Sequence, residues 1–224
     1  VTGFAMCCLQ NEEGTFNFTP WLWSTGATSY DINNDNGIKA LTLVKDLVDA
    51  GSMSKEVINW TQGDVMNQFI SGNIAMMVNG PWQVPTMREQ APDLNWDVTL
   101  LPKDAEYASC LGGENFGVID GDNVDAALDF LQFATSKDEV ASYIDDFGYI
   151  AARKDVAEGQ FTDDETMQKF TEEMQYAQPR GPHAQWPEIS DALSLAVNES
   201  ITGTSTPADA AAKAQSTIDG ILAE

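Results

Sequence analysis

Basic residues are scarce in this sequence, with 11 lysines and arginines against 35 aspartates and glutamates in 224 residues. The formal net charge at pH 7 is therefore −24. A surface this acidic repels nucleic acid, phosphorylated ligands and anionic membranes at long range. We therefore expect no nucleic-acid partner, and we interpret the acidic side chains as a solvated surface.

Cysteine and histidine are also rare, with three cysteines and one histidine in the chain. Cys7 and Cys8 are adjacent in an apolar run, and Cys110 is distant in sequence. Strand alternation sends the two neighbours to opposite faces, so a disulfide from either one to Cys110 requires neighbouring strands. We expect two buried thiols instead. Without a C-x-x-C pair, neither a zinc site nor a Cys/His nucleophile is predicted.

Long apolar runs are missing, because no stretch approaches the roughly 18 consecutive apolar residues that a membrane-spanning helix needs. No internal repeat or low-complexity linker is visible either. Hydrophobic residues nevertheless make up 43% of the chain. That share is enough to bury a core as one large domain or two small ones, so the composition predicts a globular protein.

Apolar spacing predicts a helix-rich chain with short strands between the helices. Strands are expected at residues 4–9 and 74–78, and Gly51, Gly72 and Gly148 are expected to end helices. A capping box is expected at Ser136 and Glu139. Helices are predicted near residues 38–50, 61–71, 82–91, 123–136, 136–147, 163–177, 187–201 and 207–222. These elements predict an α/β fold in which helices cover a small mixed sheet.

An aromatic ring follows the predicted strand at residues 74–78. Asn79 and Gly80 turn the chain, and Pro81 suits the first position of a helix. Trp82 is thereby presented beside the unpaired N–H groups of a helix start. The ring is either a platform for a polar ligand or a core residue that caps the strand.

Three further loops combine glycine with polar or aromatic residues. Residues 11–18 are expected to form a loop between a strand and a helix. Gly112 and Gly113 allow the backbone to approach a ligand closely, and two polar side chains follow them. Residues 179–186 are too rich in proline and glycine for a helix. We expect ligand chemistry in such loops at one edge of the fold.

Several motifs occur in a fixed order: FISGNIAMMVNGPW, WDVTLLP, LGGENFGVI, and helices that begin near residues 123 and 136. This ordered set resembles family 1 extracellular solute-binding proteins, the maltose-binding-protein-like sugar-binding components of ABC importers. The resemblance runs along nearly the whole chain. It implies a helix-rich lobe of a type II periplasmic-binding-protein-like fold. Residues 1–224 would then be a single domain, the C-terminal lobe of a two-lobed protein, with the N-terminal lobe absent.

The resemblance also implies ligand-binding positions. The tryptophan of the N-G-P-W motif typically stacks on a sugar ring, and the loop after the glycine pair supplies hydrogen bonds to sugar hydroxyls. The opening loop and the segment before residue 187 supply further contacts. The residues nominated in this way are Trp82, Gly113, Glu114, Asn115, Phe16, Asn17, Arg180 and Trp186, and Tyr149 of the FGYIAA segment is an outlying candidate. The residue types alone also allow a solvated Glu114 and an Arg180 paired with one of the many carboxylates.

The function implied by the resemblance is binding without catalysis. A sugar, in our reading an oligosaccharide, would be held as two lobes close, and both lobes would then be presented to the membrane permease. No cofactor, no metal and a monomeric state are expected. The implied location is extracytoplasmic, either periplasmic or anchored by lipid at the surface of a Gram-positive cell. The sequence departs from maltose-binding protein, so its sugar preference is not carried over.

Two other classes of function remain open. Glycoside hydrolases also combine carboxylates with aromatic platforms, but they need a carboxyl pair about 5–10 Å apart. Nothing in the sequence singles out such a pair. A binding protein for a non-sugar solute such as a polyamine or a metal ion is favoured by the acidity and disfavoured by the aromatic loops.

Overall fold

The structure is a computed structural model that describes residues 1–223. The chain divides into two compact units. Unit 1 comprises Val1–Asn79, Thr99–Leu111 and Glu173–Glu224, and unit 2 comprises Gly80–Val98 and Gly112–Glu172. The assignment of residues 1–224 to a single domain stays a prediction, and its last residue, Glu224, lies outside the described residues.

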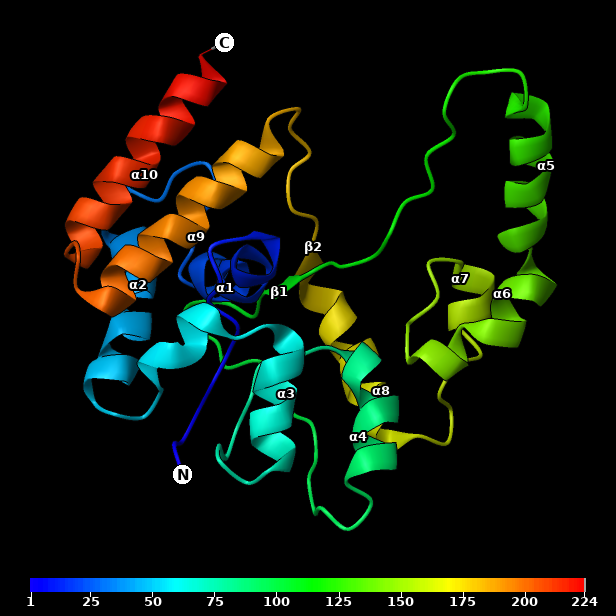
Figure 1. Ribbon diagram of the computed structural model, residues 1–224, viewed down its shortest axis with the longest axis horizontal. Coiled ribbons are helices and arrows are strands. Elements are labelled where there is room, and N and C mark those ends of the chain that lie inside the picture. The colour runs from blue at the N-terminus through cyan, green and yellow to red at the C-terminus, as the bar shows by residue number, and fades with distance from the viewer. Residues whose placement is uncertain (224) are drawn as a thin grey trace. The chain divides into compact units, whose positions relative to one another are not determined.

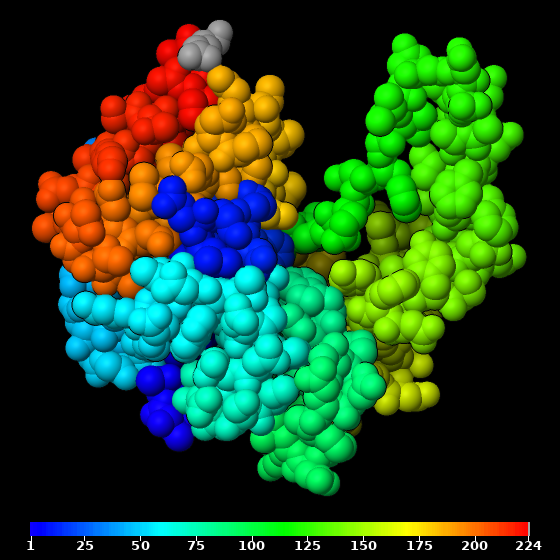
Figure 2. All heavy atoms as spheres, in the orientation of Figure 1, coloured from blue at the N-terminus to red at the C-terminus, as the bar shows by residue number. Residues whose placement is uncertain are grey.

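Unit 1 is mostly helical. It contains α1 (Glu12–Ser24), α2 (Asp35–Asp49), α3 (Gln62–Ile70), α9 (Trp186–Thr202), α10 (Pro207–Leu222) and the short 3-10 helices η1 (Lys55–Asn59) and η4 (Met174–Tyr176). Helix α9 lies against α1, α2 and α10, and Figure 1 shows α9 and α10 side by side. The atoms of these two helices form one continuous packed body in Figure 2.

The core of unit 1 is built from the apolar faces of these helices. Phe18 and Leu22 of α1, Leu41 of α2, Leu193 of α9 and Ile218 of α10 are all fully buried in one cluster. Burial of such side chains contributes about 1.5–3 kcal/mol each to folding, measured against leaving them exposed. The helices therefore hold each other in place through this shared core.

The sheet is small. Strand β1 (Ser109–Cys110) pairs in parallel with β2 (Ala177–Gln178), with Ser109 opposite Ala177. The strands predicted at residues 4–9 and 74–78 are wrong as continuous strands, because these segments form only the isolated parallel bridges Thr2–Ile74 and Ala5–Met77. The helix-rich α/β class is therefore confirmed, with a parallel pair of strands in place of the mixed sheet that we expected.

Unit 2 contains shorter elements. They are η2 (Pro81–Gln83), α4 (Val84–Gln90), α5 (Val124–Ala134), α6 (Lys137–Tyr143), η3 (Asp145–Phe147), α7 (Lys154–Ala157) and all but the last residue of α8 (Glu165–Glu173). Its buried cluster is formed by Val140, Ala151 and Val156. Arg88 of α4 donates two hydrogen bonds, of 2.7 and 2.8 Å, to the carboxylate of Asp164. This bidentate pair ties α4 to the segment before α8.

Helix boundaries follow the sequence signals at most positions. Gly51, Gly72 and Gly148 all have positive φ, as expected for residues that end helices. Thr61 and Asp64 form a capping box at the start of α3. The capping box predicted at Ser136 is wrong: Ser136 precedes α6, but its side chain makes no capping hydrogen bond.

The loop predicted for residues 11–18 is also wrong, because this stretch lies almost entirely within α1. The side chain of Asn11 accepts a hydrogen bond from the N–H of Gly14 and caps the helix. Glu12 and Glu13 occupy the first turn, where negative charge interacts favourably with the helix dipole. Phe16 and Asn17 therefore project from a helix, on different sides of it.

Gly14 is required by the close approach of the preceding chain to α1. A Cβ atom on Gly14 would lie 1.9 Å from the carbonyl oxygen of Leu9. We expect Gly14→Ala to lower the free energy of unfolding by about 3 kcal/mol, near the upper end for overpacking, because a backbone carbonyl cannot move aside easily. Urea unfolding measures this change.

Gly63, in the first turn of α3, is the matched control. A Cβ atom there would meet only the Oγ1 of Thr61, at 3.6 Å. Gly63→Ala should therefore stabilise the protein by about 0.5–1 kcal/mol. Equal effects of the two alanine substitutions would contradict the steric argument.

Candidate functional site

A polar and aromatic cluster gathers around Glu12 in unit 1. The carboxylate of Glu12 accepts hydrogen bonds from Nη1 of Arg180 and from Oγ of Ser190. It also accepts from the indole Nε1 of Trp186, at 3.0 and 3.2 Å to its two oxygens. Helix α1 thus contributes the acid, α9 contributes Trp186 and Ser190, and the loop before α9 contributes Arg180. We call these four residues with Phe16 and Tyr30 the Glu12 cluster.

Arg180 lies between an aromatic ring and the carboxylate. The centre of its guanidinium group is 4.8 Å from the ring centroid of Phe16, which is a cation–π contact. The Arg180 side chain is 19% exposed, and that of Glu12 is 47% exposed. Within the described residues, Nε of Arg180 is buried without a hydrogen-bond partner. The ion pair is therefore held at the surface with one side of Glu12 open.

Aromatic rings border the cluster. The ring of Trp186 meets that of Tyr30 edge to face, with centroids 6.5 Å apart. Tyr30 in turn lies 6.5 Å from the ring of His183. Planar polar groups bordered by aromatic faces are the combination that recognises a sugar, whose C–H face is apolar and whose rim carries hydroxyls.

Hydrogen bonds between helices hold the cluster in place. Thr15 of α1 donates its hydroxyl to the carbonyl of Ser190 in α9, at 2.8 Å. Ser190 uses its own hydroxyl proton for Glu12. Because both helices also share the core of unit 1, the positions of Glu12 and Trp186 are fixed by rigid elements.

The loop that carries Arg180 is shaped by its own backbone. Gly181 has φ of +74°, a conformation that favours glycine. The N–H of Gln185 donates to Nδ1 of His183, and the N–H of Trp186 donates to the carbonyl of His183, both at 3.1 Å. These bonds close the loop just before α9 begins, which directs Trp186 toward Glu12.

The three thiols are free, and those of Cys7 and Cys8 are buried, as predicted. Burial raises the pKa of Cys110 from 9.0 to about 11, although a hydrogen bond with Thr19 and the charge of Arg180 partly oppose this rise. Burial likewise raises the pKa of Cys7 to about 12 and that of Cys8 well above 9.0. All three thiols are therefore held in the neutral form.

The raised thiol pKa values predict a loss of stability in alkali. In the unfolded chain the thiols ionise near pH 9, but in the folded protein they stay neutral to about pH 11–12. Their contribution is complete below pH 9 and falls as the pH rises through this window. We expect the melting temperature to fall less between pH 8.5 and 11 in the triple variant Cys7→Ala, Cys8→Ala, Cys110→Ala. An equal fall in both proteins would exclude this contribution.

Unit 2 carries the remaining predicted site residues. Trp82 lies in η2, half-buried, with its indole ring against Gly80. A Cβ atom on Gly148 would lie 2.7 Å from the carbonyl oxygen of Pro81, so the segment that carries Tyr149 passes close to the turn that carries Trp82. The ring of Tyr149 stacks on that of Phe147, with centroids 6.3 Å apart.

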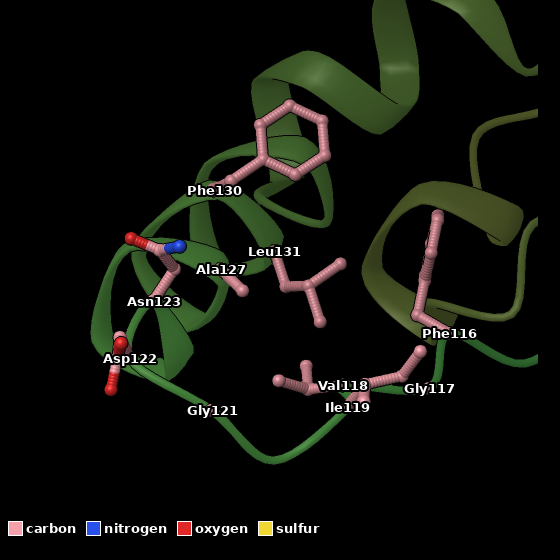
Figure 3. A pocket seen from close by; sticks show the side chains of 10 residues that line it. All are labelled: Phe116, Gly117, Val118, Ile119, Gly121, Asp122, Asn123, Ala127, Phe130 and Leu131. Atoms are coloured by element: carbon pink, nitrogen blue, oxygen red, sulfur yellow. The ribbon is translucent and has the colours of Figure 1, made fainter.

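The loop after the glycine pair is open. Gly113 has φ of +123°, and Gly113, Glu114 and Asn115 are all exposed. No predicted site residue lies among the residues that line the hollow of about 470 Å³ in unit 2. That hollow is apolar, as Figure 3 shows: Leu131 of α5 points toward Val118 and Ile119. We therefore do not assign it to sugar binding.

The structure brings together three of the nominated residues in unit 1: Phe16, Arg180 and Trp186. Asn17 lies apart from them, because it is 1% exposed and accepts a hydrogen bond of 3.1 Å from the N–H of Cys7. It is a structural residue of α1, and we do not propose it as a ligand contact. The sequence analysis did not nominate Glu12. The pattern that could have indicated it is the acidic pair Glu12 and Glu13 directly after the helix cap Asn11.

Metal-binding groups are not evident: within residues 1–223, no set of three or more His, Cys, Asp and Glu side chains is arranged to hold a metal ion. In the same range, no helix is both long enough and apolar enough to cross a bilayer.

Comparisons with known proteins identify the family of this chain. The family model described as bacterial extracellular solute-binding protein matches residues 3–169. This chain belongs to that family. The predicted family is therefore confirmed, and the family as a whole is extracellular.

Sequence relatives are putative binding proteins. One from Brucella abortus (strain 2308) and one from Brucella suis biovar 1 (strain 1330) are each 26% identical over 211 residues, which cover 89% of this chain and 51% of the relative. The chain therefore spans about half the length of the curated relatives that it matches.

Solved structures confirm the fold. The chain is similar to a Thermotoga lettingae ABC transporter solute-binding protein bound with α-D-tagatose, with TM-score 0.85 and 25% identity over 99% of this chain and 60% of that chain. It is also similar to maltose-bound MalE3 of T. maritima, with TM-score 0.84 and 22% identity, covering 99% and 61%. The GacH receptor of Streptomyces glaucescens gives TM-score 0.83 and 24% identity, covering 99% and 60%.

Proposed function

We propose that this chain is part of the solute-binding component of an ABC importer and that its ligand is a carbohydrate, in particular an oligosaccharide. The observation that carries the proposal is the Glu12 cluster, in which the Glu12–Arg180 ion pair is bordered by Phe16 and Trp186. No catalytic residue is proposed, since the family consists of solute-binding proteins.

The chemistry of the cluster suits a neutral polyhydroxyl ligand. Glu12 offers acceptor oxygens to sugar hydroxyls, and Arg180 offers donors in a planar fork. A polyamine is supported less well as the ligand, because the carboxylate of Glu12 is already neutralised by Arg180. Glycoside hydrolysis is also supported less well, because it needs a pair of carboxyl groups and the hydrogen bonds of Glu12 go to Arg180, Trp186 and Ser190.

The energetics require more contacts than one cluster supplies. A hydrogen bond nets about 0.5–1.5 kcal/mol, whereas micromolar affinity corresponds to roughly 8 kcal/mol. We therefore propose that two lobes of the complete protein close on the ligand, which is then delivered to the membrane permease. We propose additional ligand contacts within unit 2, which are Trp82, Tyr149, Gly113, Glu114 and Asn115.

Relatives support the class of ligand. Solved relatives are described with maltose, α-D-tagatose and cyclic α-maltosyl-1,6-maltose as ligands. We propose an extracytoplasmic location, in the periplasm or lipid-anchored at a Gram-positive surface, and a monomeric two-lobed protein.

The test is calorimetry of the two-lobed protein that carries this chain, against a panel of mono- and oligosaccharides. At least one saccharide should bind with micromolar or tighter affinity and raise the melting temperature. Spermidine and an aryl glycoside are the comparison compounds. Salt-sensitive binding of spermidine without any sugar binding would overturn the carbohydrate assignment, and turnover of the glycoside would overturn the assignment as a non-enzyme.

A further inference from the structure

Two tyrosines near the candidate site lie in segments outside regular helices. Tyr30 lies between α1 and α2, and Tyr149 lies between η3 and α7. In each case the residue two positions further on is buried: Ile32 is 0% exposed and Ala151 is 6% exposed. A buried backbone N–H needs a hydrogen-bond partner, and outside a helix that partner has to come from another part of the chain.

In unit 2 the partner is Gln160. Its Oε1 accepts a hydrogen bond of 2.8 Å from the N–H of Ala151, and its Nε2 donates one of 3.0 Å to the carbonyl oxygen of Tyr149. A further bond, of 2.6 Å, joins Nε2 to the carboxylate of Asp145. One side-chain amide therefore holds both the carbonyl of the tyrosine and the N–H two residues later.

In unit 1 the side chain of Gln215, in α10, repeats this pattern. Its Oε1 accepts from the N–H of Ile32 at 2.8 Å and from that of Asn33 at 3.3 Å, and its Nε2 donates to the carbonyl oxygen of Tyr30 at 3.0 Å. Here too Nε2 donates to a carboxylate, that of Asp219, at 2.7 Å. Gln160 lies 11 positions from its tyrosine and Gln215 lies 185 positions away, so local sequence does not explain the repetition.

These bonds fix the direction in which each tyrosine side chain leaves the backbone. The glutamine holds the peptide group that follows the tyrosine. The peptide group before it is held by another bond, because the N–H of Tyr149 donates to the carbonyl of Ile144 and the N–H of Tyr30 donates to Oγ1 of Thr28. Peptide groups are planar, so holding both of them sets φ and ψ of the tyrosine and the direction of its Cα–Cβ bond.

The two rings belong to the surfaces proposed to meet the ligand. Tyr149 is a proposed contact in unit 2, and its ring stacks on that of Phe147. Tyr30 is part of the Glu12 cluster, where its ring meets that of Trp186 edge to face. An aromatic ring that is already fixed in the free protein avoids the free-energy cost of ordering it when the ligand binds.

We infer that Gln160 and Gln215 are positioning residues of the sugar site, which fix Tyr149 and Tyr30 without contacting the sugar. This inference deepens the proposed function and rests on it. Each glutamine contributes to sugar affinity through its own tyrosine.

The first experiment is titration calorimetry on the two-lobed protein, with maltose, α-D-tagatose and acarbose as probes. Gln160→Ala and Gln215→Ala should each weaken binding about tenfold, which is the size expected for one aromatic contact. Parent-like affinity in either variant would overturn the assignment of that glutamine.

Ser24→Ala is the matched control. Oγ of Ser24 also bonds the backbone of a loop at two points, since it accepts from the N–H of Asp104 at 2.7 Å and donates to the carbonyl of Glu106 at 2.8 Å. This loop carries no proposed ligand contact. Ser24→Ala should therefore bind sugar as the parent protein does, and a tenfold loss there would show that any lost backbone anchor weakens binding.

Double variants separate positioning from a general loss of stability. If Gln160 acts through Tyr149, adding Gln160→Ala to Tyr149→Ala should cause no further loss of affinity, and the same should hold for Gln215→Ala with Tyr30→Ala. Additive losses would overturn the inference. If Gln160→Ala does not fold, Gln160→Glu replaces it in this test, because it keeps the length and the acceptor but lacks the N–H donors.

Hydrogen exchange provides a measurement that needs no ligand. The amide protons of Ala151 and Ile32 should exchange slowly in the parent protein and about tenfold faster in the corresponding glutamine-to-alanine variants. Unchanged exchange would overturn the inference. If no saccharide binds the parent protein, the proposed function fails, and exchange alone decides whether the glutamines hold the two segments. If sugar binds equally to parent and variants, the inference fails and the proposed function stands.

Discussion

Replacing Arg180 with alanine is expected to weaken sugar binding by about 100-fold in the two-lobed protein. The substitution removes the donors of the guanidinium fork and releases Glu12 from its ion pair. A hydrogen bond that involves a charged group contributes about 1.5–3 kcal/mol, and each 1.4 kcal/mol changes affinity tenfold. Titration calorimetry with the saccharide found in the screen measures the change.

Arg153 provides the matched control for this variant. It also pairs with a carboxylate, that of Asp155, but it lies in unit 2 outside every proposed contact. Arg153→Ala should bind the same saccharide with unchanged affinity. Surface ion pairs contribute little to stability, so both variants should unfold close to the parent protein.

Two further variants separate charge from geometry. Arg180→Lys keeps the positive charge but loses the planar fork, and it should recover only part of the lost affinity. Glu12→Gln keeps the shape of the acid and removes its charge, so it tests whether Arg180 is oriented by the ion pair. Parent-like affinity in Arg180→Ala would exclude the Glu12 cluster as the ligand site.

The sequence predicted the parts of the fold that depend on local signals. Helix α2 follows from apolar spacing, with Asn34 capping its start and Gly51 following its end. Helix α3 follows from the Thr61 capping box. Such signals act over three or four residues, so they are visible in a single sequence.

The start of α1 could not be predicted in the same way. Asn11 and the acidic pair after it are helix signals, but glycine, threonine and asparagine at positions 14, 15 and 17 favour irregular structure. Tertiary contacts decide the outcome: Gly14 lies against the carbonyl of Leu9, and Asn17 bonds the backbone of Cys7. The contacts exist only in the folded chain.

The candidate site depends on contacts that are distant in sequence. Arg180 meets Glu12 across 168 positions, and Ser190 meets it across 178. No spacing rule relates such residues, so the sequence nominated Arg180 and Trp186 through family resemblance and did not find their common partner, Glu12. For α5 the helix was predicted correctly, but no local pattern indicates that none of its residues is buried.

Gly80→Ala is expected to weaken sugar binding at least tenfold by moving the ring of Trp82. A Cβ atom on Gly80 would lie 2.1 Å from two carbon atoms of the indole ring, Cη2 and Cζ3. The backbone of Gly80 has φ of −117°, which alanine adopts without strain, so the ring and not the chain must give way. The size of the loss corresponds to about 1.4 kcal/mol, within reach of one aromatic stacking contact.

Trp82→Ala removes the same ring completely, so its loss of sugar affinity is the value with which the loss in Gly80→Ala is compared. If Trp82 stacks on the sugar from the position that Gly80 allows, the two variants should lose similar affinity in calorimetry. Gly159→Ala is the control in unit 2, because a Cβ atom there would meet only the carbonyl oxygen of Val156 at 3.6 Å. Loss of binding in Trp82→Ala alone would mean that Gly80 does not set the ring position. Full binding in both variants would leave Trp82 as a packing residue at the start of η2.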